Sequence, residues 1–208
     1  MNRGFRVNSF AIRSAGPALA VLAAVILFAI PALQTQRAGA AAQSQQAPPK
    51  QSQKEFQLTS TAFEPDGAIP VKYACIGANV SPALAWTDPP AATQSFALIV
   101  DDPDATGTAP AVHWLIYAIP SLHRALAENT LKKPSLPDGT RQGKNSAGKV
   151  GYGGPCPDPG KLHHYFFKLY ALDYVPDLKP KAKIADVEAA IKGHVLAKTE
   201  LIGRYQRE

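Results

Sequence analysis

Short apolar runs separated by turn-forming residues fill most of the chain after residue 55. Phe56–Ser60 alternates between apolar and polar positions, while Ser95–Asp101 and Ala111–Pro120 have the composition of buried strands. Glu64–Gly67 is typical of a turn, and Asp88–Pro90 interrupts the chain before the next apolar run. Strands at this spacing, with turn signals between them, predict an antiparallel β-sandwich or barrel.

The strongest strand signal lies at His163–Asp173. Side chains alternate across a strand, so one face would carry His163, Tyr165, Phe167, Leu169 and Ala171, and the other His164, Phe166, Lys168 and Tyr170. Both faces are largely apolar, which predicts a central position in the sheet.

The other elements are weaker. Val71–Cys75 predicts one more short strand. Residues 121–162 show no clear period, and a run of this length inside a compact domain counts against the assignment unless the segment is functional. A helix is predicted from four apolar residues on one side, ended by a glycine: Ile184, Val187, Ala190, Ile191 and Gly193. A second short packing helix is predicted around Leu196, Leu201 and Ile202, with His194 as a loop or capping residue between the two.

The first 40 residues have the three-part pattern of a secretory signal. An arginine-bearing start precedes the apolar run Pro17–Leu33, and Ala38–Ala40 supplies small residues for cleavage after Ala40 or Ala42. The run of 17 residues is at the lower limit for spanning a bilayer core of about 30 Å, so an uncleaved membrane anchor is the alternative. Residues 41–54, rich in Gln, Ala and Pro, predict a flexible tether before a domain at 55–208.

The charge of the chain argues against nucleic acid as a partner. The formal net charge of +6 includes four arginines within residues 1–40, a segment that holds no acidic residue. Without them, 18 basic residues stand against 16 acidic ones, and no dense basic run remains.

Two cysteines, Cys75 and Cys156, are present among the 208 residues. An even count in an exported chain fits one disulfide, whereas two small buried apolar side chains are the alternative. Sequence does not show whether the two lie within bridging distance.

Candidate chemistry gathers at the ends of two predicted strands and in one later loop. Asp102 and Asp104 follow the first strand and His113 lies in the next, so acid and imidazole should meet at one rim. Gly151–Gly160 is rich in glycine and proline, which would form a rigid wall or present backbone amides to an anion. A surface loop held by turns is the alternative for this segment.

Several motifs, in one order, resemble the phosphatidylethanolamine-binding protein family, and most closely its bacterial Raf kinase inhibitor-like branch. The resemblance runs from about Phe56 to the C-terminus and rests on Asn79–Trp86, Asp102–Asp104, His113–Trp114, Gln142–Asn145, Gly151–Pro157, His163–Tyr165 and Gly193–Ala197. It implies a mainly β fold, an antiparallel sandwich of two sheets with peripheral and C-terminal helices. It also implies a small pocket for phosphate or a phosphorylated headgroup, formed by Asp102, Asp104, His113, Trp114, Gly154, Pro155, His163 and Tyr165.

Two positions depart from the family pattern. Thr106 stands where relatives usually have proline, which would loosen the loop, and His164 stands where they usually have arginine. By alternation His164 points away from His163, so we expect this change to affect a supporting ion pair and not the pocket.

An anion-binding module is the expected function, with no cofactor and no bound metal. Imidazole, hydroxyl and amide donors suit phosphate, and binding should tighten as pH falls through about 6.5, the ordinary histidine value. The alternatives are a hydrolase or divalent-metal site using the same Asp, His and Tyr side chains, and an inhibitor of a protease or kinase that acts through a protein surface. The chain has no Gly-x-Ser-x-Gly or His-Glu-x-x-His motif, which weakens the enzyme alternative.

We further expect an exported, periplasmic or secreted protein. It would come close to a membrane through a lipid headgroup or through an uncleaved anchor. The sequence leaves the oligomeric state open.

Overall fold

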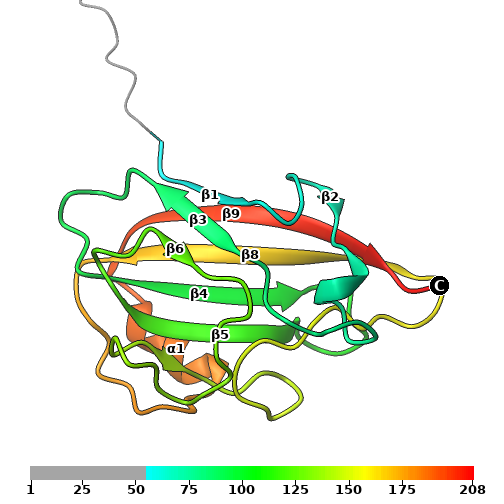
Figure 1. The fold of residues 1–208 in the computed structure, drawn as a ribbon. Helices are drawn as coiled ribbons and strands as arrows, with labels where there is room; N and C mark the ends of the chain where they lie inside the picture. Colours follow the sequence, from blue (N-terminus) through cyan, green and yellow to red (C-terminus); the bar gives the residue numbers. More distant parts are fainter. Residues whose placement is uncertain (1–54) are drawn as a thin grey trace, which may run out of the picture. The chain divides into compact units, whose positions relative to one another are not determined.

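The computed structural model describes residues 55–208, which fold into two β-sheets and one α-helix (Figure 1). The predicted signal segment 1–40 and tether 41–54 lie outside the described residues. Within 55–208, no helix is both long and apolar enough to cross a bilayer.

The larger sheet has six strands, with β8 (Leu162–Leu172) near its centre, between β9 (Val195–Gln206) and β4 (Ser95–Asp102). The strand order is β2-β9-β8-β4-β5-β7, where β5 is Ala111–Pro120 and the two outermost strands are β2 (Gly67–Ala68) and β7 (Arg141–Gln142). Neighbours are antiparallel except β2, which runs parallel to β9. The predicted strands at 95–101, 111–120 and 163–173 and the central position of the last are therefore confirmed.

The smaller sheet covers one face of the larger one (Figure 1) and contains β1 (Gln57–Ser60), β3 (Leu84–Thr87) and β6 (Ala125–Leu126). The main core fills the space between the sheets and includes Trp86, Phe96, Trp114 and Phe167. Residues of β4 alternate between this core and a second one on the opposite face, so both faces of β4 are buried. The predicted two-sheet sandwich is confirmed.

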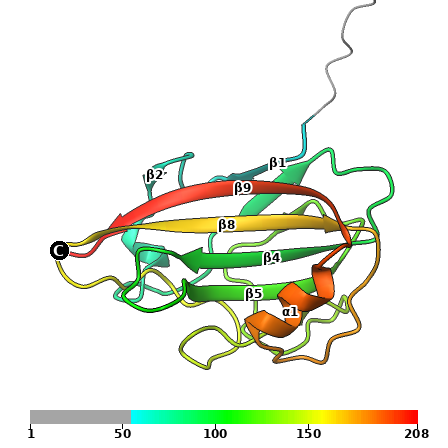
Figure 2. The same ribbon diagram turned by 180° about the vertical axis from the view of Figure 1, so that it is seen from behind.

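The second core is closed by α1 (Ile184–Ile191), which packs on the face of the large sheet seen in Figure 2. Val187 and Ile191 are its buried residues, in agreement with the predicted apolar side. The chain leaves the helix through Gly193, whose φ of +83° is a conformation that glycine adopts without strain.

Two predicted elements are wrong. The expected second C-terminal helix is β9, which pairs with β8 along its length and buries alternate residues at Leu201 and Tyr205. The expected strand at 71–75 is a 3₁₀ turn, η1 (Val71–Tyr73). Local hydrogen bonds close it from the Tyr73 amide to Pro70 and from the Ala74 amide to Val71.

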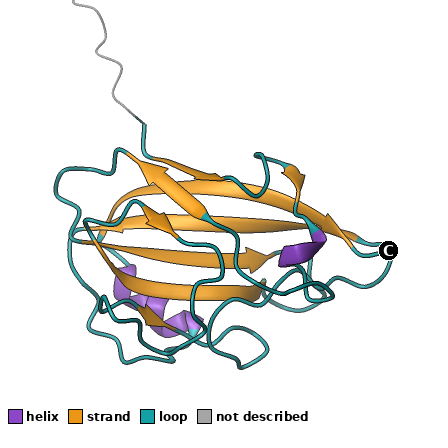
Figure 3. Cartoon of the chain, viewed as in Figure 1, coloured by secondary structure: helices purple, strands orange, loops and turns teal. Residues whose placement is uncertain are grey.

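Between β5 and the start of β8 at Leu162, the described chain holds only the short strands β6 (Ala125–Leu126) and β7, as the lack of period predicts. Their loops are ordered by buried side chains that bond to the backbone. The Gln142 side chain accepts a hydrogen bond from Trp114 Nε1 at 2.7 Å and donates to the carbonyl oxygens of Leu131 and Lys133 at 2.6 and 2.8 Å. Figure 3 shows that strands and connecting loops make up most of the described fold, with little helix.

Candidate functional site

A cavity of about 610 Å³ lies where β4 ends and where β5 and β8 begin. Four of the eight predicted site residues line it: Asp102, His113, Gly154 and His163. Strand pairing places Asp102 beside Ala111 and Asp101 beside Phe166. Segments far apart in the sequence meet at the cavity for this reason.

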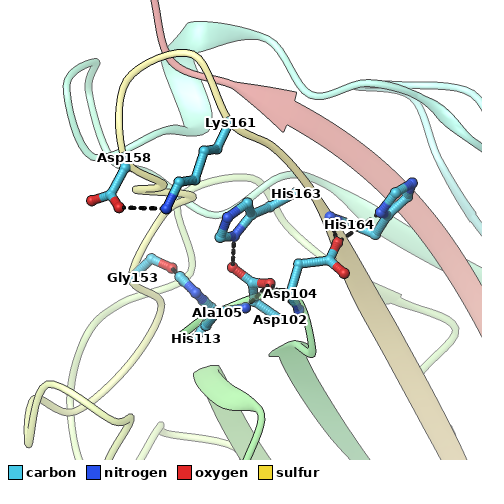
Figure 4. Close-up of polar contacts among 9 residues, drawn as sticks. All are labelled: Asp102, Asp104, Ala105, His113, Gly153, Asp158, Lys161, His163 and His164. Carbon is cyan, nitrogen blue, oxygen red and sulfur yellow. Dashed lines mark hydrogen bonds and ion pairs between the residues drawn. The ribbon is translucent and has the colours of Figure 1, made fainter. Parts of the chain in front are cut away.

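Asp102 and His163 form a buried pair (Figure 4). His163 Nδ1 donates to Asp102 Oδ2 at 2.8 Å, and the side chains are 9% and 4% exposed. The other carboxylate oxygen accepts the backbone N–H groups of Asp104 and Ala105 at 2.9 and 3.0 Å. Both oxygens of Asp102 are thus occupied, and the ring of His163 is held with Nε2 on the side away from Asp102.

His113 is oriented by the backbone. Its Nδ1 lies 2.8 Å from the carbonyl oxygen of Gly153, which can only accept, so Nδ1 carries the proton and Nε2 remains for a ligand. The Tyr165 ring packs edge-on against the imidazole with ring centres 5.1 Å apart. Both histidines therefore use Nδ1 for support and leave Nε2 for binding.

Tyr165 is buried behind His113 and is not among the residues lining the cavity. Its hydroxyl makes no hydrogen bond of acceptable geometry with residues 55–208. Burial raises the pKa of Tyr165 well above its ordinary value, and the negative charge of Asp102 raises it further. The hydroxyl therefore stays protonated across the physiological range.

The glycine-rich segment forms one wall of the cavity. The Gly154 amide donates to Asn79 Oδ1 at 2.8 Å, and a Cβ at Gly154 would lie 2.1 Å from the carbonyl oxygen of Tyr73. Only glycine fits at this contact. The prediction of close backbone approach in this segment agrees with this geometry.

Cys75 and Cys156 are joined in a disulfide with their Cα atoms 5.4 Å apart, and both line the cavity. The Cys75 amide also donates to the Pro155 carbonyl at 3.0 Å. The disulfide therefore links the segment after η1 to the glycine-rich wall.

The remaining predicted site residues do not line the cavity. Trp114 is fully buried and bonds to Gln142, because neighbours on a strand point to opposite faces and His113 takes the cavity side. Pro155 is buried, and its carbonyl accepts from Cys75. Pro155, Trp114 and Tyr165 are thus not among the lining residues, and their roles in ligand binding stay predictions.

Asp104 is exposed outside the cavity and pairs with His164 (Figure 4). Its Oδ2 accepts from the His164 backbone amide and ring Nδ1 at 2.8 and 2.7 Å. These hydrogen bonds, that of the ring first, lower the pKa of Asp104. His164 turns away from His163 into a supporting pair, as its alternation predicts, whereas Asp104 belongs to that pair and not to the lining.

Several lining residues were not predicted. Asn79 lay in a recognised motif without an assigned role, and Lys132, Lys149 and Asp158 come from loops without a periodic signal. Thr106, the departure from proline, also lines the cavity. In the described part of the chain, no three His, Cys, Asp or Glu side chains are placed to hold a metal ion.

The fold and site together define a two-sheet β-sandwich with an imidazole-lined cavity at one end of its larger sheet. The family model described as phosphatidylethanolamine-binding protein matches residues 59–206. A UPF0098 protein of Methanothermobacter thermautotrophicus is 49% identical over 150 residues, which cover 72% of this chain and 98% of that protein. The chain belongs to the phosphatidylethanolamine-binding protein family.

Solved structures agree with this assignment. The crystal structure of Escherichia coli YbcL, described as a member of the mammalian PEBP family, matches with a TM-score of 0.69 and 33% identity. That match covers 74% of this chain and 99% of YbcL. A Mycobacterium tuberculosis protein named as a candidate lipoprotein, LppC, is 35% identical over 159 residues, 76% of each chain.

Proposed function

We propose that this protein is an exported binding module whose cavity takes up phosphate or a phosphorylated headgroup-type anion. The observation that carries the proposal is the presence of two imidazoles, His113 and His163, which line one cavity and use only Nδ1 for structural bonds. When protonated, each Nε2 donates a charge-assisted hydrogen bond to an anion.

Asp102 has a positioning role in this proposal. A carboxylate beside an imidazole fixes its orientation and stabilises its charged form. His163 then faces the ligand with a fixed ring, while the carboxylate is held on the Nδ1 side of the ring. The family assignment supports a small phosphorylated ligand, since the family is named for phosphatidylethanolamine.

Binding without catalysis is the function we favour. The buried carboxylate is used by His163 and two backbone amides, and the Tyr165 hydroxyl is buried and not exposed in the cavity lining. Neither is placed as a nucleophile with an adjacent base. A hydrolase using the same side chains would release inorganic phosphate from a bound phosphate ester, whereas a binding module would not.

Calorimetric titration with sulfate and with phosphoethanolamine tests the proposal. Sulfate keeps its charge between pH 5 and 8, so any pH dependence of its affinity reports the protein. We expect sulfate affinity to rise at least tenfold from pH 8 to pH 5.5 as the imidazoles take up protons. His113→Ala should abolish the rise, and His123→Ala, which changes a histidine outside the cavity lining, should leave it intact.

A flat sulfate affinity across this range, or equal binding by His113→Ala, would overturn the proposal. Release of inorganic phosphate from phosphoethanolamine by the native protein but not by His113→Ala would establish a hydrolase instead. A crystal soaked with phosphoethanolamine should show the phosphate group within hydrogen-bond distance of His113 Nε2.

Export is proposed from the signal-like residues 1–40 and the disulfide, and the relative named as a lipoprotein supports it. Expression of the full chain in a bacterial host, followed by fractionation and N-terminal sequencing, tests it. A mature chain starting at Ala41 or Gln43 in the periplasm is expected. An uncleaved chain in the membrane fraction would establish the anchored alternative, and an uncleaved cytoplasmic chain would exclude export.

A further inference from the structure

Two lysines, Lys132 and Lys149, line the same cavity as the imidazoles, and the proposed phosphate site uses neither of them. They come from two separate loops. Neither has a carboxylate partner within ion-pair distance among residues 55–208. These are therefore two positive charges without a protein counter-charge beside them.

Lys132 is fixed at both ends of its side chain. Its Nζ donates to the backbone carbonyl of Asn79 at 2.7 Å, and the Asn79 side chain in turn accepts from the Gly154 amide. Its stem lies directly on Gly151, where an added Cβ would come within 3.0 Å of the Lys132 Cα, Cβ and Cγ atoms. The ammonium group is thus attached to the same wall that supports the phosphate site.

Lys149 is placed by a buried asparagine. Asn145 Oδ1 accepts from the amides of Ala147 and Lys149 at 3.1 and 3.0 Å, and its Nδ2 donates to the Gly151 carbonyl at 3.3 Å. Both lysine loops therefore converge on Gly151. Burial and the neighbouring charge of Lys149 lower the pKa of Lys132, because both disfavour its charged form.

The lysines and the imidazoles line one cavity, and one short segment of its wall connects Lys132 to His113. His113 is bonded to the Gly153 carbonyl, and Gly151 is two residues away, at most about 7 Å between Cα atoms. Asp158, the other charged lining residue on the side of His163, is paired with Lys161 at 3.0 Å (Figure 4). Its charge is therefore offset, and the excess positive charge lies at the lysines.

We infer that the ligand of this cavity is a phosphorylated molecule with a second anionic group, a carboxylate or another phosphate, which binds at Lys132 and Lys149. This inference rests on the proposed function, since it places the phosphate at the imidazoles. It assigns the lysines as specificity-determining residues, because the cationic ammonium of an ethanolamine group gains nothing from them, whereas an added carboxylate does.

O-phosphoserine and phosphoethanolamine differ by one carboxylate and form a matched pair of probes. At low salt we expect phosphoserine to bind about tenfold more tightly, and the preference to shrink as ionic strength screens the lysines. Lys132→Gln/Lys149→Gln should remove the preference without changing the affinity for phosphoethanolamine. The control Lys133→Gln/Lys144→Gln changes the net charge equally, outside the cavity lining, and should retain it.

Glycerophosphoserine and glycerophosphoethanolamine form a second pair with the phosphodiester of a lipid headgroup. A preference for the serine member of this pair supports the inference with a lipid headgroup as the source. A preference for phosphoserine over phosphoethanolamine, without one in the glycerol pair, supports the inference with a soluble phosphate monoester as the ligand. Equal affinities within both pairs overturn the inference and leave the phosphate site standing, whereas failure of all four compounds to bind overturns both proposals.

Discussion

His163 Nδ1 lies 2.8 Å from Asp102 Oδ2, and both side chains are buried at the edge of the cavity. The same carboxylate closes the loop after β4 by accepting two backbone amides. The Asp102 side chain therefore fixes both the loop after β4 and the imidazole of His163 on β8.

Substitution of Asp102→Asn tests this coupling. The amide can still accept the loop hydrogen bonds, but it removes the charge that stabilises a protonated His163. We expect sulfate affinity at pH 5.5 to fall about tenfold and its pH dependence to weaken, measured by calorimetry. The control Asp104→Asn changes a carboxylate outside the cavity lining and should bind as the native protein does. Unchanged sulfate affinity in Asp102→Asn would contradict the positioning role.

The disulfide between Cys75 and Cys156 spans 81 residues. Loop-closure entropy for this separation gives a stabilisation of at most about 4.5 kcal/mol, and measured values are commonly 2 to 4 kcal/mol. Urea unfolding of Cys75→Ser/Cys156→Ser should show a loss in this range. A reducing agent should lower the free energy of unfolding of the native protein to that of the variant and leave the variant unchanged. Equal stability of oxidised native protein and variant would contradict the role of the bridge.

Gly154 and Gly107 allow a matched test of the wall. A Cβ at Gly154 would lie 2.1 Å from the Tyr73 carbonyl oxygen and within 3 Å of the Ala74 backbone, whereas at Gly107 the nearest atom is 3.5 Å away. Gly154→Ala should lower the free energy of unfolding by about 3 kcal/mol or more and weaken anion binding, because backbone has to move. Gly107→Ala should change stability by less than about 1 kcal/mol. Similar stability of the two variants in urea would refute the contact.

Much of this site could be predicted from sequence because its two main strands carry strong local patterns. β4 has an apolar run at Phe96–Val100 and β8 alternates in burial, so the placement of His163 and the outward turn of His164 follow from period alone. The same rule should have excluded Trp114 from the cavity, since it adjoins His113 on one strand. Two residues that are adjacent on a strand face opposite sides, so being next to a site residue does not place a side chain in the site.

Two kinds of feature could not be predicted from local pattern. The first half of β9 is exposed or half-buried, so Val195–Glu200 lacks the contrast that marks a strand, and its pairing with β8 decides its conformation. Lys132 is held at the cavity by a long-range bond to Asn79 and by the bond of Gln142 to the adjacent Leu131, and Lys149 by a loop bond to Asn145. Such bonds leave no periodic signal in the sequence.

The exposed pair of Asp104 and His164 makes a further prediction for acidic pH. Hydrogen bonds from the His164 ring and amide lower the pKa of Asp104, so its folded value lies below the unfolded value of about 3.9. A carboxyl with a lowered folded pKa contributes stability that is complete above the unfolded pKa and is lost as pH falls through the folded one. The contribution is small because the pair is exposed.

His164→Ala should therefore raise the pKa of Asp104 toward its ordinary value, measured from its carboxyl ¹³C resonance between pH 2 and 6. The shift should be partial, because the backbone amide of residue 164 still donates to Asp104. His194→Ala, which removes the partner of Asp173 instead, is the control and should leave Asp104 unchanged. An Asp104 titration that is identical in the native protein and His164→Ala would show that the ring does not support the carboxylate in solution.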